Sequence, residues 1–168
     1  GYKLTQLPIV RFFLAYFNLH SISLNNNLKT IPLSQIIGSP FSKKFIFKNK
    51  IDKIENLNRI LFSNFDEISF EKIKSLCSTE ILLKVFYPKE DAFICIEDSI
   101  SILNFIRKNK NLDEFNISVS EILLDTFEEM MIKSEKNHLK IPKDALYYIM
   151  NELLKAKKLD FKGDKMNG

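Results

Sequence analysis

The stretch that most constrains the fold is LLKVFYPKEDAFICIED, residues 82–98, in which two apolar runs are separated by Pro88 and three charged residues. Apolar residues occupy both alternating faces of each run, a pattern typical of strands that are covered on both sides. Pro88 also suits the second position of a type I turn. We therefore predict a buried hairpin with strands at 82–87 and 92–97, whose solvated tip is formed by Lys89, Glu90 and Asp91.

Periodicity predicts the remaining elements. Alternating or β-branched and aromatic residues favour further strands at 20–24, 28–31 and 41–48. Apolar residues spaced three and four apart predict helices at 7–17, 51–63, 69–78, 98–109, 119–136 and 142–158. The most specific local signal is Ser118-Val119-Ser120-Glu121, a capping box preceded by Ile117 as a hydrophobic staple. Asp98 and Pro142 are the predicted starts of two other helices.

Together these elements predict an α+β fold, in which a small mixed or antiparallel sheet is covered by helices and the C-terminal third is largely helical. We assign residues 1–116 to an α+β core and 117–168 to a C-terminal helical hairpin packed on the same core, as one domain. The chain has 168 residues, of which 45% are hydrophobic and 27% charged. It is therefore long enough, and apolar enough, for a continuous core.

The cysteines and the most apolar segment indicate where in the cell the protein is expected. Cys77 and Cys95 lie in apolar runs rather than in a spaced disulfide framework, which favours a reducing environment. The N-terminal run PIVRFFLAYF is interrupted by Arg11 and is shorter than the roughly 20 residues that a membrane span needs. We expect a cytoplasmic protein that does not enter a membrane.

Sequence signatures of common enzymes are missing. The chain contains no GxxxxGK[ST], GxGxxG, HExxH, GxSxG or paired CxxC pattern, and it has four glycines in all. His20 and His138 are the two imidazoles, and we expect each to be solvated or locally hydrogen-bonded at a helix end. Both cysteines are expected to be buried and inert. We therefore predict no catalytic, cofactor-binding or metal-binding residues, and a protein that is not an enzyme.

Charge is unevenly distributed along the chain. Residues 1–60 carry a net charge of +7, residues 61–135 carry −7 and residues 136–168 carry +4. In the first part, lysines alternate with Phe41, Phe45 and Phe47, a composition typical of single-stranded nucleic-acid platforms. The same alternation describes an edge strand with buried rings and protective lysines. The candidate partner-binding lysines are Lys43, Lys44, Lys48 and Lys50.

In the second part, carboxylates gather on one side of the helix predicted at 119–136. Glu121, Asp125 and Glu128 are spaced by four and three residues, so their side chains lie over one another. This stripe is either a solvated acidic face or a docking surface for a basic partner.

These observations favour a non-enzymatic protein–protein interaction or regulatory module, one that could self-associate. The alternative is nucleic-acid binding, either through the basic segment or through a winged-helix arrangement of residues 51–97, in which two helices precede the predicted hairpin. Neither interpretation calls for a cofactor.

Overall fold

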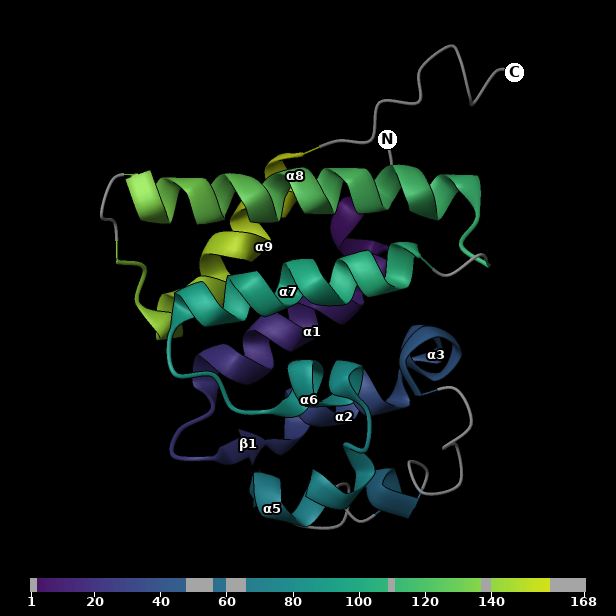
Figure 1. Cartoon of the computed structure of the whole chain (residues 1–168), viewed down its shortest axis with the longest axis vertical. Coiled ribbons are helices and arrows are strands. Elements are labelled where there is room, and N and C mark those ends of the chain that lie inside the picture. Colours follow the sequence, from purple (N-terminus) through teal and green to yellow (C-terminus); the bar gives the residue numbers. More distant parts are fainter. Residues whose placement is uncertain (1–2, 48–55, 60–65, 109–110, 137–139, 158–168) are drawn as a thin grey trace.

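The computed structural model describes residues 3–47, 56–59, 66–108, 111–136 and 140–157. Helices make up most of this part of the chain, and its two strands have three residues each (Figure 1). The prediction of a sheet covered by helices is therefore wrong, because the fold is mainly helical. The elements in chain order are η1 Leu4–Gln6, α1 Pro8–Ile22, β1 Asn27–Lys29, α2 Thr30–Gly38, α3 Pro40–Ser42, η2 Lys43–Phe47, β2 Glu67–Ser69, α5 Phe70–Ile73, η3 Lys74–Leu76, α6 Glu80–Phe86, α7 Ala92–Arg107, α8 Glu114–Lys136, η4 Lys143–Ala145 and α9 Leu146–Ala156.

The predicted hairpin at 82–97 is helical on both sides of Pro88. Thr79 Oγ1 accepts a hydrogen bond of 3.4 Å from Leu82 N, and Asp91 Oδ1 accepts one of 2.9 Å from Ile94 N. Each is an N-cap directly before an apolar run, so α6 and α7 begin there. Apolar residues on both alternating faces therefore reflect helices buried around most of their circumference. The hairpin that the winged-helix interpretation needed is absent from residues 80–107, all of which the structure describes.

Helix α1 is the centre of the fold, and α2, α7, α8 and α9 pack around it (Figure 1). It begins at Pro8 as predicted but continues to Ile22, past the predicted end at Asn18 or His20. The predicted strand at 20–24 is consequently wrong. The chain turns only at Asn25 and Asn26, whose φ angles of 54° and 65° lie in the left-handed region that asparagine tolerates.

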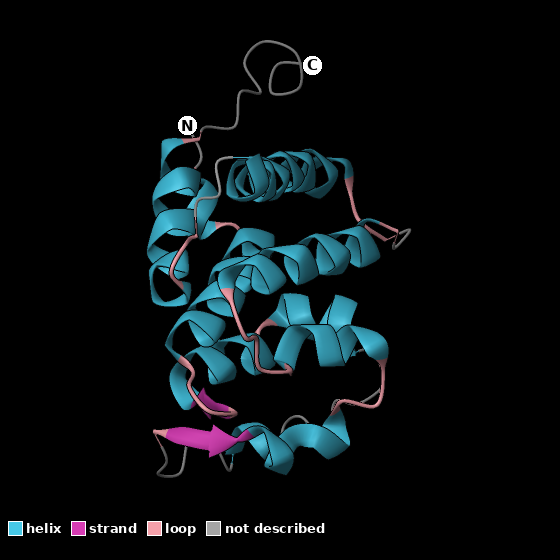
Figure 2. Cartoon of the chain, turned by 60° about the vertical axis from the view of Figure 1, so that its left-hand side comes forward, coloured by secondary structure: helices cyan, strands magenta, loops and turns pink. Residues whose placement is uncertain are grey.

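The two strands pair antiparallel at one end of the molecule, with Leu28 opposite Ile68 (Figure 2). Residues 28–31 were predicted as a strand paired with 20–24, but β1 instead pairs with β2, some 40 residues further along the chain. The predicted strand at 41–48 is also wrong, because α3 and the π-helical turn η2 occupy residues 40–47. Residue 48 and most of the helix predicted at 51–63 lie outside the described residues.

Helix α8 begins five residues before the predicted start. Asp113 Oδ1 accepts a 2.8 Å hydrogen bond from Asn116 N and so caps the helix, which places the predicted capping box inside it. The boundary assigned between residues 116 and 117 also falls within α8. Helices α7 and α8 run antiparallel, side by side (Figure 1). Asp98, predicted as an N-cap, lies in the middle of α7.

Aromatic residues form the contact between α1 and α8. The Phe127 ring lies 5.2 Å from that of Phe13 and 5.3 Å from that of Phe17, both in edge-to-face geometry. All three side chains are fully buried. Such pairs contribute beyond the area that they remove from water, so they fix α8 on the central helix.

Candidate functional site

Lys89 is buried, although it was predicted at a solvated tip. Its side chain is 2% exposed, and its Nζ lies 2.6 Å from Asp98 Oδ2 on α7. The same ammonium donates to the Lys84 carbonyl at the end of α6 and lies 5.9 Å from the centre of the Tyr16 ring. Burial lowers the pKa of Lys89, and the hydrogen bond with Asp98 opposes that shift. The α6–α7 turn is thus tied down by an ion pair.

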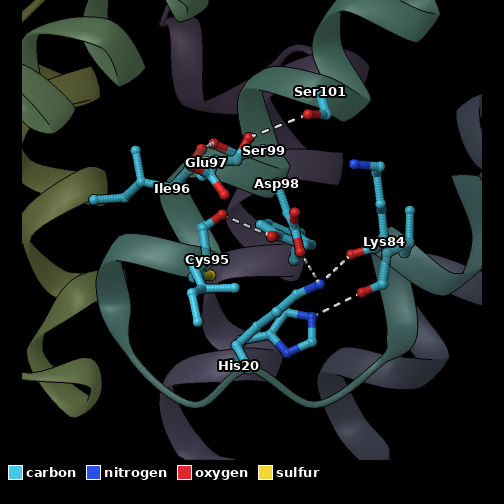
Figure 3. A network of polar contacts seen from close by, with 12 residues as sticks. His20, Lys84, Cys95, Ile96, Glu97, Asp98, Ser99 and Ser101 are labelled. Atoms are coloured by element: carbon cyan, nitrogen blue, oxygen red, sulfur yellow. Dashed lines mark hydrogen bonds and ion pairs between the residues drawn. The ribbon is translucent and has the colours of Figure 1, made fainter.

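Two side chains of α1 complete this buried polar cluster, which comprises Tyr16, His20, Lys89, Cys95 and Asp98. Figure 3 shows three of its members, His20, Cys95 and Asp98. The Tyr16 hydroxyl donates to the Cys95 carbonyl at 2.7 Å. His20 Nε2 lies 2.7 Å from the Val85 carbonyl oxygen and therefore carries the proton. Tyr16 and His20 each donate to a main-chain carbonyl of α7 or α6, so they join α1 to the two helices on either side of the α6–α7 turn, as structural side chains do. The other ring nitrogen of His20, Nδ1, is buried and has no hydrogen-bond partner within the described part of the chain.

His20 was expected at a solvated or locally bonded helix end, but it is fully buried. Burial lowers the pKa of His20 to about 3, and the nearby charges of Lys89 and Lys143 act in the same direction. Burial also raises the pKa of the Cys95 thiol to about 12. Both cysteines are free and buried, as predicted, and the raised pKa keeps Cys95 a thiol rather than a nucleophilic thiolate at neutral pH.

The free energy of unfolding should decrease as the pH falls below about 6.5, because His20 stays neutral in the folded chain and takes up a proton in the unfolded chain. Its pKa is about 3 when folded and 6.5 when unfolded, so the unfolded chain takes up the proton first as the pH falls. Stability is unaffected by this group above about pH 6.5, and the loss grows until about pH 3; at pH 5 it amounts to about 2 kcal/mol. Urea unfolding at pH 7.5, 6 and 5 measures it.

The matched variant for that measurement is His20→Gln, which keeps an N–H donor for the Val85 carbonyl and cannot titrate. Its stability should fall less steeply between pH 7.5 and pH 5 than that of the unmodified chain. Equal slopes for the two proteins would show that the histidine titrates normally in the folded state.

The second feature is a groove of about 1200 Å³ that runs over α1 between α2 and α9, here named the α1–α2–α9 groove. Its floor is apolar and includes Phe12, Leu14 and Ala15 of α1. Its rim carries mainly uncharged hydrogen-bonding side chains, and Arg11 and Asp66 are the two charged residues among the described residues that line it. These described residues are Thr5, Pro8, Arg11, Phe12, Leu14, Ala15, Asn18, Thr30, Ile31, Ser34, Gln35, Gly38, Ser39, Pro40, Asp66, Tyr147 and Asn151.

None of the predicted partner-binding residues that the structure describes lines this groove. Lys43 and Lys44 are in η2, whereas Lys48 and Lys50 lie outside the described residues. The rings that were to form a nucleic-acid platform are buried: Phe41, Phe45 and Phe47 are 7%, 5% and 5% exposed. The acidic residues Glu121, Asp125 and Glu128 are exposed along α8, as the spacing predicted, and none of them lines the groove.

Sequence reasoning did not find the groove. Its one local signal was Arg11, the single charged residue in the apolar run PIVRFFLAYF, which served only to argue against a membrane span. The walls come from residues more than 100 positions apart, so their juxtaposition depends on how α2 and α9 pack against α1.

Comparison with known protein families, curated proteins and solved structures gives no match to this chain. Among the described residues, no helix is long and apolar enough to cross a membrane. The same residues contain no group of three or more His, Cys, Asp or Glu side chains placed to hold a metal ion. The chemistry of the groove is therefore the basis on which a function can be argued.

Proposed function

We propose that the chain is a non-enzymatic protein-interaction module that binds a segment of a partner protein in the α1–α2–α9 groove. The observation that carries this proposal is the lining: an apolar floor bordered by uncharged hydrogen-bonding side chains such as Asn18, Gln35 and Asn151. An apolar floor gives affinity for the apolar face of a peptide, and polar groups at the rim fix its position.

Other occupants match the groove less well. Binding to nucleic acid requires several cations along the backbone path, whereas Arg11 is the one cation among the lining residues that the structure describes. Pockets for small molecules measure about 300–1,000 Å³ and enclose the ligand. The α1–α2–α9 groove, at about 1200 Å³, is larger than one such ligand fills. The described part of the lining includes no imidazole or thiol and Asp66 as its single carboxylate, so these residues do not supply an acid–base pair. A length of polypeptide is the occupant that the size and polarity favour.

Gly38 offers a way to block the groove without disturbing the core. It is exposed at the end of α2 and lines the groove. Among the described residues outside α2, a Cβ built there would meet Asn58 Nδ2 at 3.5 Å, which is ordinary van der Waals contact. A side chain can therefore begin at this position without a close contact, and an indole is large enough to fill part of the groove; circular dichroism of Gly38→Trp checks that the fold is kept.

The test is selection of peptides from a displayed random library on the intact chain, followed by fluorescence anisotropy with the enriched peptides. We expect Gly38→Trp to weaken their binding at least tenfold, because the indole occupies the site. The control is Asn104→Trp, which adds the same ring at an exposed position of α7 outside the groove and should leave binding unchanged.

Two results would contradict the proposal. Peptides that bind the Gly38→Trp and unmodified proteins equally would place the interaction outside the groove. Sedimentation that shows a dimer, dissociated by Gly38→Trp but not by Asn104→Trp, would assign the groove to a second copy of the chain rather than to a separate partner.

A further inference from the structure

We infer that the α1–α2–α9 groove holds its occupant as a helix in one direction, with the N-terminal end beside Asp66 and the C-terminal end beside Arg11. This inference rests on the proposed function and adds to it the conformation, the direction and the charge pattern of the partner segment. It follows from where the two charged residues of the lining lie relative to the three helices.

The ends of the groove are defined by α1 and α2, which run antiparallel. The start of α2 lies beside the end of α1, because Lys29 N donates to Ser23 Oγ at 3.2 Å. The other end of α2 leads to Phe41, whose ring lies 5.5 Å from that of Phe12 near the start of α1. Helix α9 also runs antiparallel to α1, since Tyr147 N at its start donates to Ser21 Oγ at 2.9 Å.

Asp66 and Arg11 therefore mark opposite ends. The Asp66 carbonyl accepts from Thr30 N at 2.9 Å, which places this residue at the start of α2. Arg11 precedes Phe12 in the first turns of α1, next to the segment that follows the end of α2. Both residues are exposed, and neither forms an ion pair within the described part of the chain. Each is free to meet a charge on an occupant.

The walls favour a helical occupant over an extended one. A helix packs well between two other helices because its ridges of side chains fit into their grooves. An extended peptide gains its main-chain hydrogen bonds by adding to an exposed sheet edge. None of the residues of β1 or β2 lines the groove. The occupant therefore meets helix surfaces and side chains at the rim, not strand main chain.

The length of the groove sets the spacing of charges on that helix. Along α1, Arg11 lies seven positions before Asn18, the last residue of that helix in the described lining, a rise of about 10 Å. Positions i and i+7 of a helix share one face and are about 10 Å apart along the axis. A basic side chain at i would meet Asp66, and an acidic side chain at i+7 would meet Arg11. The helix dipole, positive at its N-terminus, favours the same direction.

The experiment is a helical peptide library on a fixed alanine-rich scaffold, with Lys or Glu at positions i and i+7 and apolar residues varied between them. On the unmodified chain we expect peptides with Lys first and Glu second to be enriched about tenfold over those with the reverse order, because the reverse order can form the same two ion pairs only by turning round, which sets the helix dipole against both charges. Arg11→Glu combined with Asp66→Lys should keep this order but turn the bound peptide round, so that a nitroxide on its N-terminus broadens the NMR signals near residue 11 instead of those near residue 66. Arg11→Gln combined with Asp66→Asn should remove the preference while binding continues.

The outcomes test two claims separately: the direction of the bound helix and the groove as the binding site. Equal enrichment of both orders, with binding that is still lost in Gly38→Trp, overturns the direction and leaves the groove as the binding site. Enrichment that Gly38→Trp does not affect, or no enrichment from this or the random library, overturns the proposed function. The order preference should also weaken between 50 and 500 mM salt, because it depends on exposed charges.

Discussion

Replacing Asp98 with leucine should lower the free energy of unfolding by about 3–5 kcal/mol, because it leaves the Lys89 ammonium buried without a counterion. The Lys89 side chain is 2% exposed, and its remaining acceptor is the Lys84 carbonyl. The chain can respond only by deprotonating the amine or by opening the α6–α7 turn to water, and both cost stability. Urea unfolding at pH 7, followed by circular dichroism, measures the loss.

Replacing the other member of the ion pair, Lys89, should cost less stability. Lys89→Met keeps the length of the side chain and leaves the Asp98 carboxylate unpaired, but that side chain is 19% exposed and so has access to water. We expect a loss of about 1–3 kcal/mol. The double variant, Lys89→Met with Asp98→Leu, removes both charges and should be more stable than Asp98→Leu alone. Additive losses in the double variant would show that the two groups do not interact in the folded protein.

An exposed ion pair provides the control for this cycle. Lys29 Nζ lies 3.3 Å from Glu67 Oε2, and the two side chains are 39% and 46% exposed. Glu67→Gln should therefore change the free energy of unfolding by less than about 1 kcal/mol. A loss as large as that of Asp98→Leu would show that burial is not the reason for the effect.

The class of the fold could not be derived from apolar periodicity alone. In residues 82–97 the apolar positions fill both alternating faces, a pattern that fits a covered strand and a buried helix equally. What distinguishes them is the residue before each run: Thr79 and Asp91 are N-caps, and their side chains accept from Leu82 N and Ile94 N. Asp113 is a similar N-cap, and its position would have predicted that α8 begins at Glu114 rather than at residue 119.

Some elements were predictable because a local signal agrees with the final packing. Pro8 opens α1, and Ser69 Oγ accepts from Glu71 N at the start of α5, both at the predicted positions. Elements that depend on distant partners were not predictable. Strand β1 pairs with β2 across 40 residues, and His20 is fully buried in α1 because α6, which comes later in the chain, offers it the Val85 carbonyl.

The buried polar cluster depended on such distant contacts too. A lysine between Pro88 and Glu90 is typical of an exposed turn, and its burial follows only once α7 brings Asp98 back toward it. In the predicted hairpin these two residues would have been separated by the length of a strand. The groove is similar, since Arg11 and Asp66 become its two ends only when α2 lies antiparallel to α1.

Removing the aromatic ring of Phe127 should destabilise the chain about as much as breaking the buried ion pair. Phe127→Ala deletes a fully buried ring that lies within 5.3 Å of both Phe13 and Phe17. The expected loss is about 3–5 kcal/mol, made up of lost transfer free energy and the cavity left between α1 and α8. Phe127→Leu fills part of that space and should cost clearly less.

The control for this substitution lies five residues further along the same helix. Ile132 is 55% exposed, so Ile132→Ala also shortens an apolar side chain of α8 but creates no cavity and should change stability by about 0.5 kcal/mol or less. Hydrogen exchange should show faster opening of α8 in Phe127→Ala than in Ile132→Ala, because the ring joins that helix to α1. Equal losses in the two variants would mean that α8 does not depend on its aromatic contact for its place in the fold.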